Sequence, residues 1–356
     1  MRDMLKKMNK NTKNNLITYG IVIAAFIIMQ TLISTGSISS LMEGLMVPLC
    51  IYIILAVSLN LVVGILGELS LGHAGFMCVG AFTSAFFSKC MRDVITIAPL
   101  RFILALLIGM AVAAVFGIII GIPVLRLKGD YLAIVTLAFG EIIKNLVNVL
   151  FIGKDSNGFH FSTKDVMDLN MEADGTVLVN GPQGITGTPK DSTFLIGVIL
   201  ILITLFIVIN MINSRDGRAI MAIRDNRIAA ESVGINVTKY KLMAFTVSAA
   251  LAGAAGVLYA HNLSTLTANT NNFGYNMSIN ILVFVVLGGI GSIRGSMIAA
   301  VILTLLPELL RGLSDYRMLI YAIVLILMML FNWSPKAIEW REKYLSFGKK
   351  KKEAVK

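Results

Sequence analysis

Long apolar runs separated by short polar stretches dominate the pattern of this chain. A helix that crosses a bilayer needs about 20 predominantly apolar residues, and about ten runs approach or reach that length. The pattern predicts helices over residues 16–35, 43–64, 70–89, 102–122, 131–151, 193–212, 242–261, 278–292, 296–310 and 317–333. The predicted fold class is all-α, a polytopic membrane helical bundle. The eighth and ninth runs are short and separated only by a glycine-rich turn, so they are either full spans or half-helices.

Lysines and arginines cluster beside these runs, and their placement predicts which way the helices cross. Cytoplasmic loops of membrane proteins carry an excess of Lys and Arg. Residues 1–15 hold five basic residues, residues 213–241 hold six and residues 334–356 hold eight. We expect all three segments, and hence both termini, in the cytoplasm. Residues 152–192 hold six acidic residues and three lysines, so we expect an external loop there, within a membrane domain spanning residues 16–333.

Composition and motifs exclude most other classes of protein. The chain of 356 residues is 56% hydrophobic and only 14% charged, whereas soluble domains carry about 25% charged residues. A net charge of +11 is compatible with nucleic-acid binding, but the basic residues sit beside the spans, so we expect no nucleic-acid partner. The sequence has no P-loop, no H-E-x-x-H and no G-x-S-x-G, and its three histidines are scattered. We therefore expect no enzyme, no catalytic residue, no metal site and no cofactor bound by this chain.

Two segments share a glycine-interrupted pattern that suggests an internal repeat. Residues 60–87 read NLVVGILGELSLGHAGFMCVGAFTSAFF, and residues 280–306 read NILVFVVLGGIGSIRGSMIAAVILTLL. Transporters place such broken helices along the substrate path, whereas glycine also simply permits close helix packing. Both interpretations are open for the first segment, and packing is favoured for the second. The candidate polar residues of a path at the first segment are Asn60, Glu68 and His73.

The fifth predicted span carries two charges, Glu141 and Lys144. A charge at the centre of a bilayer costs at least about 2.5–3.5 kcal/mol. The spacing of three residues places both side chains on one helix face, where they can neutralise each other. Two interpretations follow, either a structural ion pair inside the bundle or a pair that lines a translocation path.

The basic segment 213–241 reads NSRDGRAIMAIRDNRIAAESVGINVTKYK. It predicts a short amphipathic helix that is capped by Asp225 or Asn226 and ends before Gly234, at a position where glycine is favoured. The expected apolar face comprises Ile228, Ala229, Ala230 and Val233, with Arg227 and Glu231 beside it. Such a helix either inserts into a groove on a cytoplasmic partner or lies on anionic lipid.

Four stretches of the chain are distinctive in combination. They are NLVVGILGELSLGHAGF from Asn60, LRLKGDYLAIVTLAFGEIIKNL from Leu125, NGPQGITG from Asn180, and GRAIMAIRDNRIAAESVGINVTKYKLMAFTVSAALAGAAGVLYA from Gly217. Together they resemble the LivM-type permease family of bacterial branched-chain amino acid importers, which are ABC transporters. The resemblance runs from about Ile51 to Phe331. It implies a permease subunit of the bacterial inner membrane that performs no covalent chemistry.

The resemblance implies a role for residues 213–241, which we name the coupling segment. Importer permeases present a cytoplasmic coupling helix to an ATPase, and Ile228 stands here where the usual motif has glutamate. The residues implied for ATPase coupling are Arg218, Arg224, Ala229, Ala230, Glu231 and Gly234. The candidate residues of the translocation path are Asn60, Glu68, His73, Glu141 and Lys144.

The same resemblance implies a set of partners. A second homologous permease of the LivH type completes the path, two cytoplasmic P-loop ATPases hydrolyse ATP, and an extracytoplasmic binding protein delivers branched-chain amino acids. One alternative is a related permease for urea, simple amides, nucleosides or sugars, although residues 129–137 (GDYLAIVTL) favour the amino acid group. Another is an ion-coupled secondary transporter, with Glu68, His73 and Glu141 as proton sites.

Overall fold

The computed structural model describes residues 10–36, 39–92, 94–127, 129–172, 175–310 and 316–333. Its helices are α2 (Lys10–Ser34), α3 (Ser40–Asn60), α4 (His73–Cys90), α5 (Ala98–Val124), α6 (Asp130–Val149), α7 (Phe194–Asn213), α8 (Arg215–Asp225), α9 (Arg227–Ser232), α10 (Val237–Ala260), α11 (Thr270–Phe273), α12 (Tyr275–Gly288), α13 (Ile293–Leu309) and α14 (Arg317–Trp333). Each predicted apolar run falls on one of these helices. Most of the predicted N-terminal segment and the whole predicted tail lie outside the described residues.

Six helices in the described part of the chain are long and apolar enough to cross a bilayer. They are α2 from Asn15 onward, α3 with the π-helical turn that follows it, α5, α6, α7 and α10. These helices confirm a polytopic membrane protein. The helices α12 and α13 have 14 and 17 residues, so they rise only about 21 and 25 Å against a hydrocarbon core of about 30 Å. They form the short pair that the sequence predicted.

The predicted external loop contains β-structure, so the all-α class was incomplete. Strand β1 (Phe151–Asp155) pairs antiparallel with β2 (Gly158–Ser162) on one side and with β3 (Thr176–Asn180) on the other. A second small sheet joins β4 (Ile185–Thr186) to β5 (Thr265–Leu266). The alternating and β-branched residues of FHF and TVLV carried this signal, which the strong helical pattern elsewhere obscured.

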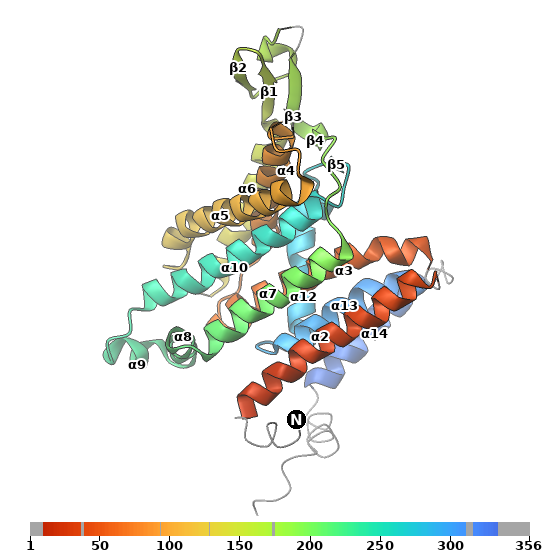
Figure 1. Cartoon of the computed structure of the whole chain (residues 1–356). Helices are drawn as coiled ribbons and strands as arrows, with labels where there is room; N and C mark the ends of the chain where they lie inside the picture. Colours follow the sequence, from red (N-terminus) through yellow and green to blue (C-terminus); the bar gives the residue numbers. More distant parts are fainter. Residues whose placement is uncertain are drawn as a thin grey trace, which may run out of the picture.

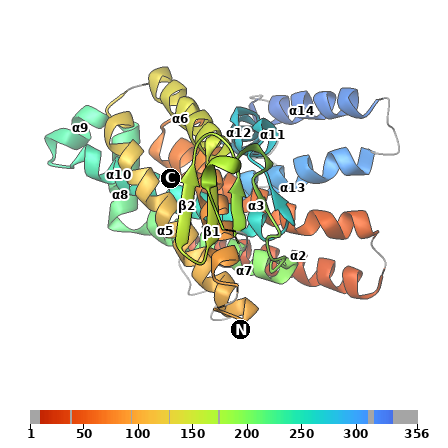
Figure 2. The same cartoon turned by 90° about the horizontal axis from the view of Figure 1, so that it is seen from above.

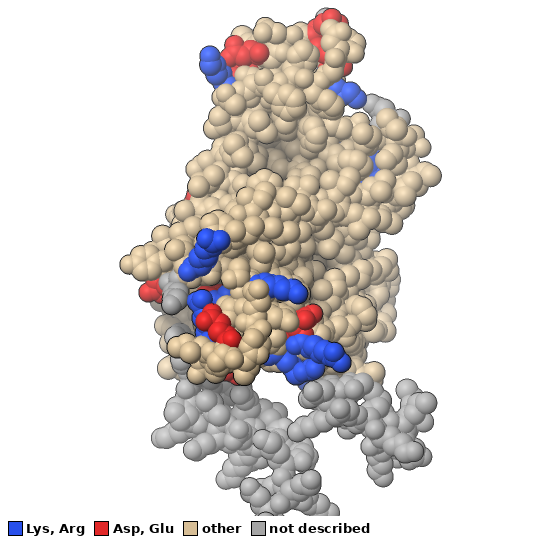
Figure 3. Space-filling model, turned by 90° about the vertical axis from the view of Figure 1, so that its left-hand side faces the viewer, with Lys and Arg blue, Asp and Glu red and all other residues tan. Residues whose placement is uncertain are grey.

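The external loop and the coupling segment lie at opposite ends of the molecule. Figure 1 shows the three-stranded sheet at the top, with α8, α9 and the start of α2 toward the bottom. In Figure 3, Lys, Arg, Asp and Glu gather toward these two ends, and the surface between them is almost free of charge on that face. Lipid tails require such an apolar belt. The charge pattern and the fold therefore agree that the two segments are separated by the membrane-embedded part.

Helix α10 forms the centre of one half of the bundle and packs most extensively against α4 and α5. Small residues permit this approach, because they let helix backbones meet. The buried face of α5 toward α10 carries small residues at every fourth position, namely Gly109, Ala113, Gly117 and Gly121. On α4, a Cβ atom at Gly80 would lie 2.5 Å from the Cα atom of Gly253 in α10. This half is therefore packed backbone to backbone.

Two irregular stretches interrupt the helices where the sequence has its glycine-rich pattern. The first, residues 67–72, follows a π-helix (η1, Leu61–Leu66) that extends α3, and α4 begins directly after it. The second, residues 289–292, separates α12 from α13. Gly67 and Gly291 have φ of +80° and +82°, a region that favours glycine. We call these stretches the first and second glycine breaks.

Helix α3 connects two sides of the molecule. Figure 2, the view from above, shows α2, α13 and α14 projecting on one side and α5, α6 and α9 on the other. Between them, α3 packs against α7, α10, α12 and α13. More than half of α3 is buried, which explains why its apolar residues show no single lipid-facing stripe. Both glycine breaks border this central helix.

A matched pair of glycine substitutions tests the contact between α4 and α10. A Cβ atom at Gly80 would lie 2.4 Å from the Gly253 carbonyl oxygen, whereas one at Gly44 in α3 meets no atom within 4 Å. We expect Gly80→Ala to lower the midpoint of thermal unfolding in detergent, because overpacking costs about 1–3 kcal/mol. Gly44→Ala should maintain or raise the midpoint, since alanine is favoured over glycine in helices by about 1 kcal/mol. Equal midpoints would contradict this packing.

Candidate functional site

The coupling segment contains two helices, α8 and α9, placed between α7 and α10. Ser214 caps α8, because its Oγ accepts a hydrogen bond of 3.0 Å from the amide of Gly217. Asn226 caps α9, and its Oδ1 accepts from the amide of Ala229 at 3.1 Å. Of the two predicted caps, Asn226 is therefore confirmed, while Asp225 is the last residue of α8. The sequence pattern predicted α9 but not α8.

Gly234 ends α9 in the predicted way. Its φ is +85°, which favours glycine over residues with a side chain. The amides of Gly234 and Ile235 donate to the carbonyl oxygens of Glu231 and Ala230, at 3.0 and 3.1 Å. This pair of bonds is the Schellman pattern of a helix that ends on glycine. Both ends of the short helix are thus fixed by local hydrogen bonds.

The exposed face of α9 differs from the predicted one at a single position. Ile228 and Val233 are 80% and 75% exposed, and Ala229 is exposed as well. Ala230 is only 3% exposed and packs in a small cluster with Ile223 of α8, so its prediction as part of the outer face is wrong. Successive helical residues are about 100° apart, which turns Ala230 away from Ile228 and toward α8.

The charged residues among the predicted coupling residues are exposed as well. Arg218 is exposed, and its Nη1 donates to the carbonyl oxygen of Asn213 at 3.1 Å. Glu231 pairs with Arg227 one turn earlier, at 3.0 Å. Such an exposed pair contributes only about 0.3–0.5 kcal/mol. These side chains therefore remain available to a partner at little cost in stability.

Arg224 connects the coupling segment to the broken helix. Its Nη1 donates to the carbonyl oxygen of Gly64 in η1, 2.9 Å away. Its aliphatic stem occupies the space that a side chain at Gly67 would need. Gly64 lies in the last turn of η1, where backbone carbonyl groups have no partner within the helix. The guanidinium of α8 thus completes the hydrogen bonding of the helix that precedes the first glycine break.

A second link lies close to this one. Lys241, in the second turn of α10, forms an ion pair with Glu68 of the first glycine break. The two side chains are only 6% and 16% exposed. Removing either partner would leave a largely buried charge unpaired, which is strongly unfavourable. Glu68 therefore anchors the break to α10.

Asn60, the last residue of α3, binds the second glycine break and the start of α13. Its Oδ1 accepts from the amide of Gly291 at 2.9 Å, and its Nδ2 donates to Oγ of Ser296 at 3.0 Å. The backbones also meet there, since a Cβ atom at Gly64 would lie 2.3 Å from the nitrogen of Gly291. Asn60 itself is 1% exposed. The two halves of the repeat-like pattern are thus packed on each other, which favours the packing interpretation of their glycines.

His73 and the residues around it are also enclosed. His73 is 2% exposed, and its Nε2 lies 2.7 Å from Oγ of Ser58 in α3. The next amide, that of Ala74, donates to Oγ of Ser278 in α12 at 3.1 Å. The start of α4 is therefore held by α3 and α12, and His73 contributes to this packing.

Glu141 and Lys144 form the ion pair expected from their spacing, with 2.5 Å between Oε2 and Nζ. Lys144 also donates to Oγ1 of Thr270, at 3.2 Å. The other carboxylate oxygen of Glu141 accepts from the amide of Tyr275, at 2.8 Å. Tyr275 is the first residue of α12, so a negative charge stabilises the positive end of that helix. The pair ties α6 to α11 and α12, which favours the structural interpretation.

The structure brings together only some of the predicted site residues. Glu68 and Arg224 meet at the first glycine break, whereas Asn60 binds Gly291 of the second break. His73 is buried against Ser58, the remaining coupling residues lie on α8, on α9 or directly after it, and Glu141 and Lys144 lie apart, at the start of α12. Lys241 also lies at the first glycine break, paired with Glu68. From the sequence, it served only to predict the orientation of the helices. A lysine near the start of a predicted span needs a partner, and that requirement could have pointed to Glu68.

Comparisons with known proteins give related permeases. The family described as "Branched-chain amino acid transport system / permease component" matches residues 41–331. The high-affinity branched-chain amino acid transport system permease protein LivM of Salmonella typhimurium is 37% identical over 298 residues, which cover 81% of this chain and 67% of the relative. Its LivH counterpart from the same organism is 24% identical over 78% of this chain and 88% of the relative. The ribose import permease protein RbsC of Escherichia coli is 28% identical over 78% and 81%. No solved structure matches the chain significantly.

A double substitution tests whether Glu141 and Lys144 act as one structural pair. Glu141→Gln and Lys144→Met each leave one charge without its partner, so each should lower the free energy of unfolding by about 1.5–3 kcal/mol. The double variant should recover at least half of either loss, because no unpaired charge remains. Thermal unfolding in detergent measures the three variants. Losses that simply add in the double variant would show that the two charges act independently.

Proposed function

Because the chain belongs to the permease family of branched-chain amino acid transport systems, we propose that it forms one half of the translocation path of an ATP-driven importer for branched-chain amino acids. The coupling segment carries this proposal. It presents exposed apolar side chains between α7 and α10 and reaches the first glycine break through Arg224. The chain is a transport component and not an enzyme.

In the proposed orientation, α8 and α9 face the cytoplasm and the β1–β3 sheet faces outward. The six basic residues of the coupling segment and the acidic excess of the external loop support this direction. Both termini then lie in the cytoplasm of a bacterial cell, and the membrane is its inner membrane. About ten helices cross or enter the bilayer, with α12 and α13 as the short pair. The first glycine break lies near the cytoplasmic end, beside Arg224 and Lys241.

Two cytoplasmic P-loop ATPases are the proposed partners of α9. Ile228 and Val233 are large apolar side chains that lie almost fully in solvent, and such anchors suit a groove on a partner protein. Arg218, Ala229, Glu231 and Gly234 surround them and complete the contact surface. Ala230 is not part of this surface, because it is buried against Ile223 of α8. ATP is bound and hydrolysed by these partners, and this chain needs no cofactor.

The coupling segment is placed to pass motion to the membrane helices. A displacement of α8 acts on the Gly64 carbonyl through Arg224, and a displacement of α10 acts on Glu68 through Lys241. The contact of Gly64 with Gly291 then carries the shift to α12 and α13. Direct contact between backbones transmits a displacement well, because close-packed interiors have low compressibility. The two glycine breaks are thus the proposed moving parts.

A second permease of the LivH type is proposed to cover α6. This helix has one buried face and one exposed face, and the exposed side includes Ile142, Asn145, Leu146 and Val149. Asparagine in an apolar helix surface favours a neighbouring helix, with which it can form hydrogen bonds. The similarity of this chain to LivH as well as to LivM supports two related subunits around one path.

The relatives support the proposed substrate and the proposed binding protein that delivers it. An extracytoplasmic binding protein is proposed to dock at the β1–β3 end and to release the amino acid into the path. A sugar permease is the alternative, since the ribose permease RbsC is also related, but its identity of 28% is below the 37% of LivM. An ion-coupled transporter is disfavoured, because Glu68 and Glu141 are each paired with a lysine.

ATP dependence is the first test of the proposal. The complete complex of both permeases and ATPases, in vesicles with a loaded binding protein outside, should import leucine only when ATP is enclosed on the ATPase side. Excess ribose should not compete with leucine, whereas isoleucine and valine should. Uptake driven by a proton gradient in vesicles without the ATPases would overturn the proposed class of transporter.

Arg224→Met tests the path of coupling, with Arg215→Met as the matched control. Arg224 donates to the Gly64 carbonyl, whereas Arg215 is exposed at the start of the same helix. We expect Arg224→Met to reduce leucine imported per ATP hydrolysed at least tenfold, with the ATPases still bound. Arg215→Met should behave as the wild type.

Three readouts separate the outcomes of this test, namely ATPase co-purification, ATP hydrolysis and leucine uptake. Normal coupled uptake by Arg224→Met would exclude this contact from the coupling path. Loss of ATPase binding would instead make Arg224 a docking residue.

A further inference from the structure

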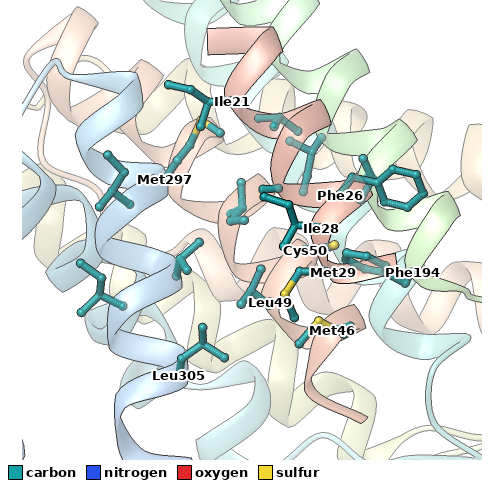
Figure 4. Close-up of a pocket in the computed structure, with 18 residues that line it drawn as sticks. Ile21, Phe26, Ile28, Met29, Met46, Leu49, Cys50, Phe194, Met297 and Leu305 are labelled. Carbon is teal, nitrogen blue, oxygen red and sulfur yellow. The ribbon is translucent and has the colours of Figure 1, made fainter. Parts of the chain in front are cut away.

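An apolar groove of about 440 Å³ lies between α2 and α13, and no described part of the chain fills it. Its walls come from α2, α3, α7 and α13. Figure 4 shows aliphatic, aromatic and methionine side chains from these helices around the groove, with sulfur as the only heteroatom among the drawn side chains. An apolar lining predicts an apolar occupant, because a buried polar group would find no strong hydrogen-bond partner inside.

The depth of the groove places it among lipid tails. Its lining on α2 extends from Ile21 to Met29, and the apolar run of α2 begins at Leu16. At a rise of 1.5 Å per residue, the groove covers about 8 to 20 Å from the start of that run. The hydrocarbon core is about 30 Å thick. The groove therefore spans the middle of the membrane, and its Ile21 end lies in the leaflet that contains the start of α2.

The groove suits a flexible hydrocarbon chain. Its lining extends over about 12 Å of α2, from Ile21 to Met29, and contains only aliphatic, aromatic and sulfur-containing side chains. A lipid tail matches such a lining, and its charged head needs a partner only at the end of the groove.

A cation lies at the cytoplasmic end of the groove. Arg294, in the first turn of α13, donates from Nε to Oγ1 of Thr18 in α2, at 2.6 Å. Thr18 precedes the lining residue Ile21 by one turn, and Arg294 precedes the lining residue Met297 by one turn. Arg294 is half-buried. Guanidinium groups bind phosphate oxygens well because of their planar fork of N–H donors.

We propose that the groove binds one acyl chain of an anionic phospholipid of the cytoplasmic leaflet, with the lipid phosphate at Arg294. The leaflet follows from the orientation given under the proposed function, but the site is separate from the coupling segment and the glycine breaks. The lipid fills the space that separates α2 from α13. The matched family region begins only at residue 41, so α2 precedes it. Within the described chain α2 packs chiefly on α7, and the lipid fills the space between α2 and α13 beyond the Arg294–Thr18 hydrogen bond.

Lipid retention by the purified complex tests the site. The complete complex is reconstituted in vesicles of phosphatidylglycerol and phosphatidylcholine, extracted in mild detergent and analysed by native mass spectrometry. The wild type should retain one phosphatidylglycerol per copy of this chain. Ala25→Trp, which fills the groove, and Arg294→Gln, which removes the cation, should each reduce that retention at least fivefold. Ile298→Trp fills the same groove from α13 and serves where Ala25→Trp folds poorly.

Two control variants introduce a tryptophan or remove an arginine away from the groove. Leu107→Trp lies on the exposed side of α5, where Leu107 is 58% exposed, and Arg126→Gln removes an exposed cation beyond the end of that helix. Both should retain phosphatidylglycerol like the wild type, and thermal midpoints confirm that all variants are folded.

Unchanged retention in folded Ala25→Trp and Ile298→Trp would overturn the groove as the site. Equal retention of phosphatidylcholine by the wild type would overturn the role of Arg294. Loss of the second permease from the Ala25→Trp complex would assign the groove to a protein interface instead. Failure of ATP-dependent uptake in the wild type affects the proposed function and leaves this lipid measurement intact.

Discussion

Inside a bilayer, an unpaired backbone amide or carbonyl group costs several kcal/mol, and every interruption of a helix creates such groups. This chain interrupts two of its central helices. Side chains from elsewhere in the sequence pair the groups around the breaks. Arg224 binds the Gly64 carbonyl and Asn60 binds the Gly291 amide. The amide of Leu71 donates to Thr136 of α6 in the same way, at 3.0 Å. The need to satisfy backbone groups thus determines which helices meet at the breaks.

This constraint also explains why the coupling segment and the membrane helices form one unit. The side chain that completes the hydrogen bonding of η1 comes from α8, and the charge that neutralises Glu68 comes from α10. Both partners flank α9, which displays Ile228 and Val233 to the solvent. A force applied at α9 therefore reaches η1 through the Arg224 hydrogen bond and the first glycine break through the largely buried Lys241–Glu68 ion pair. No covalent chemistry is needed for such a role.

The two sides of the bundle differ in how tightly they are packed. Around α10, glycines and alanines bring backbones into contact, so that even a methyl group at Gly80 has no room. Around α2, the helix exposes most of its surface and borders an open apolar groove. Protein atoms fill the space on the first side, and lipid is the natural material to fill it on the second. A dense side transmits strain, whereas a lipid-filled side can adjust to it.

The sequence by itself determined the features that depend on near neighbours. Apolar runs predicted the membrane helices, because each helix pairs its own backbone and must be apolar over its length. The cap at Asn226, the helix end at Gly234 and the pairing of Glu141 with Lys144 involve residues within a turn or two of each other, and all three appear as predicted. The strands of the external loop were the local feature that the strong helical pattern obscured.

Only the tertiary structure decided the contacts between distant segments. Lys241 and Glu68 are 173 positions apart, and Gly291 and Asn60 are 231 apart. Ala230 has the same local character as Ala229, yet α8 covers one and leaves the other exposed. Polar residues in a membrane signal that they need partners, but many partners are chemically equivalent. The choice among them depends on how the helices pack, and that is set by the shape of the whole bundle.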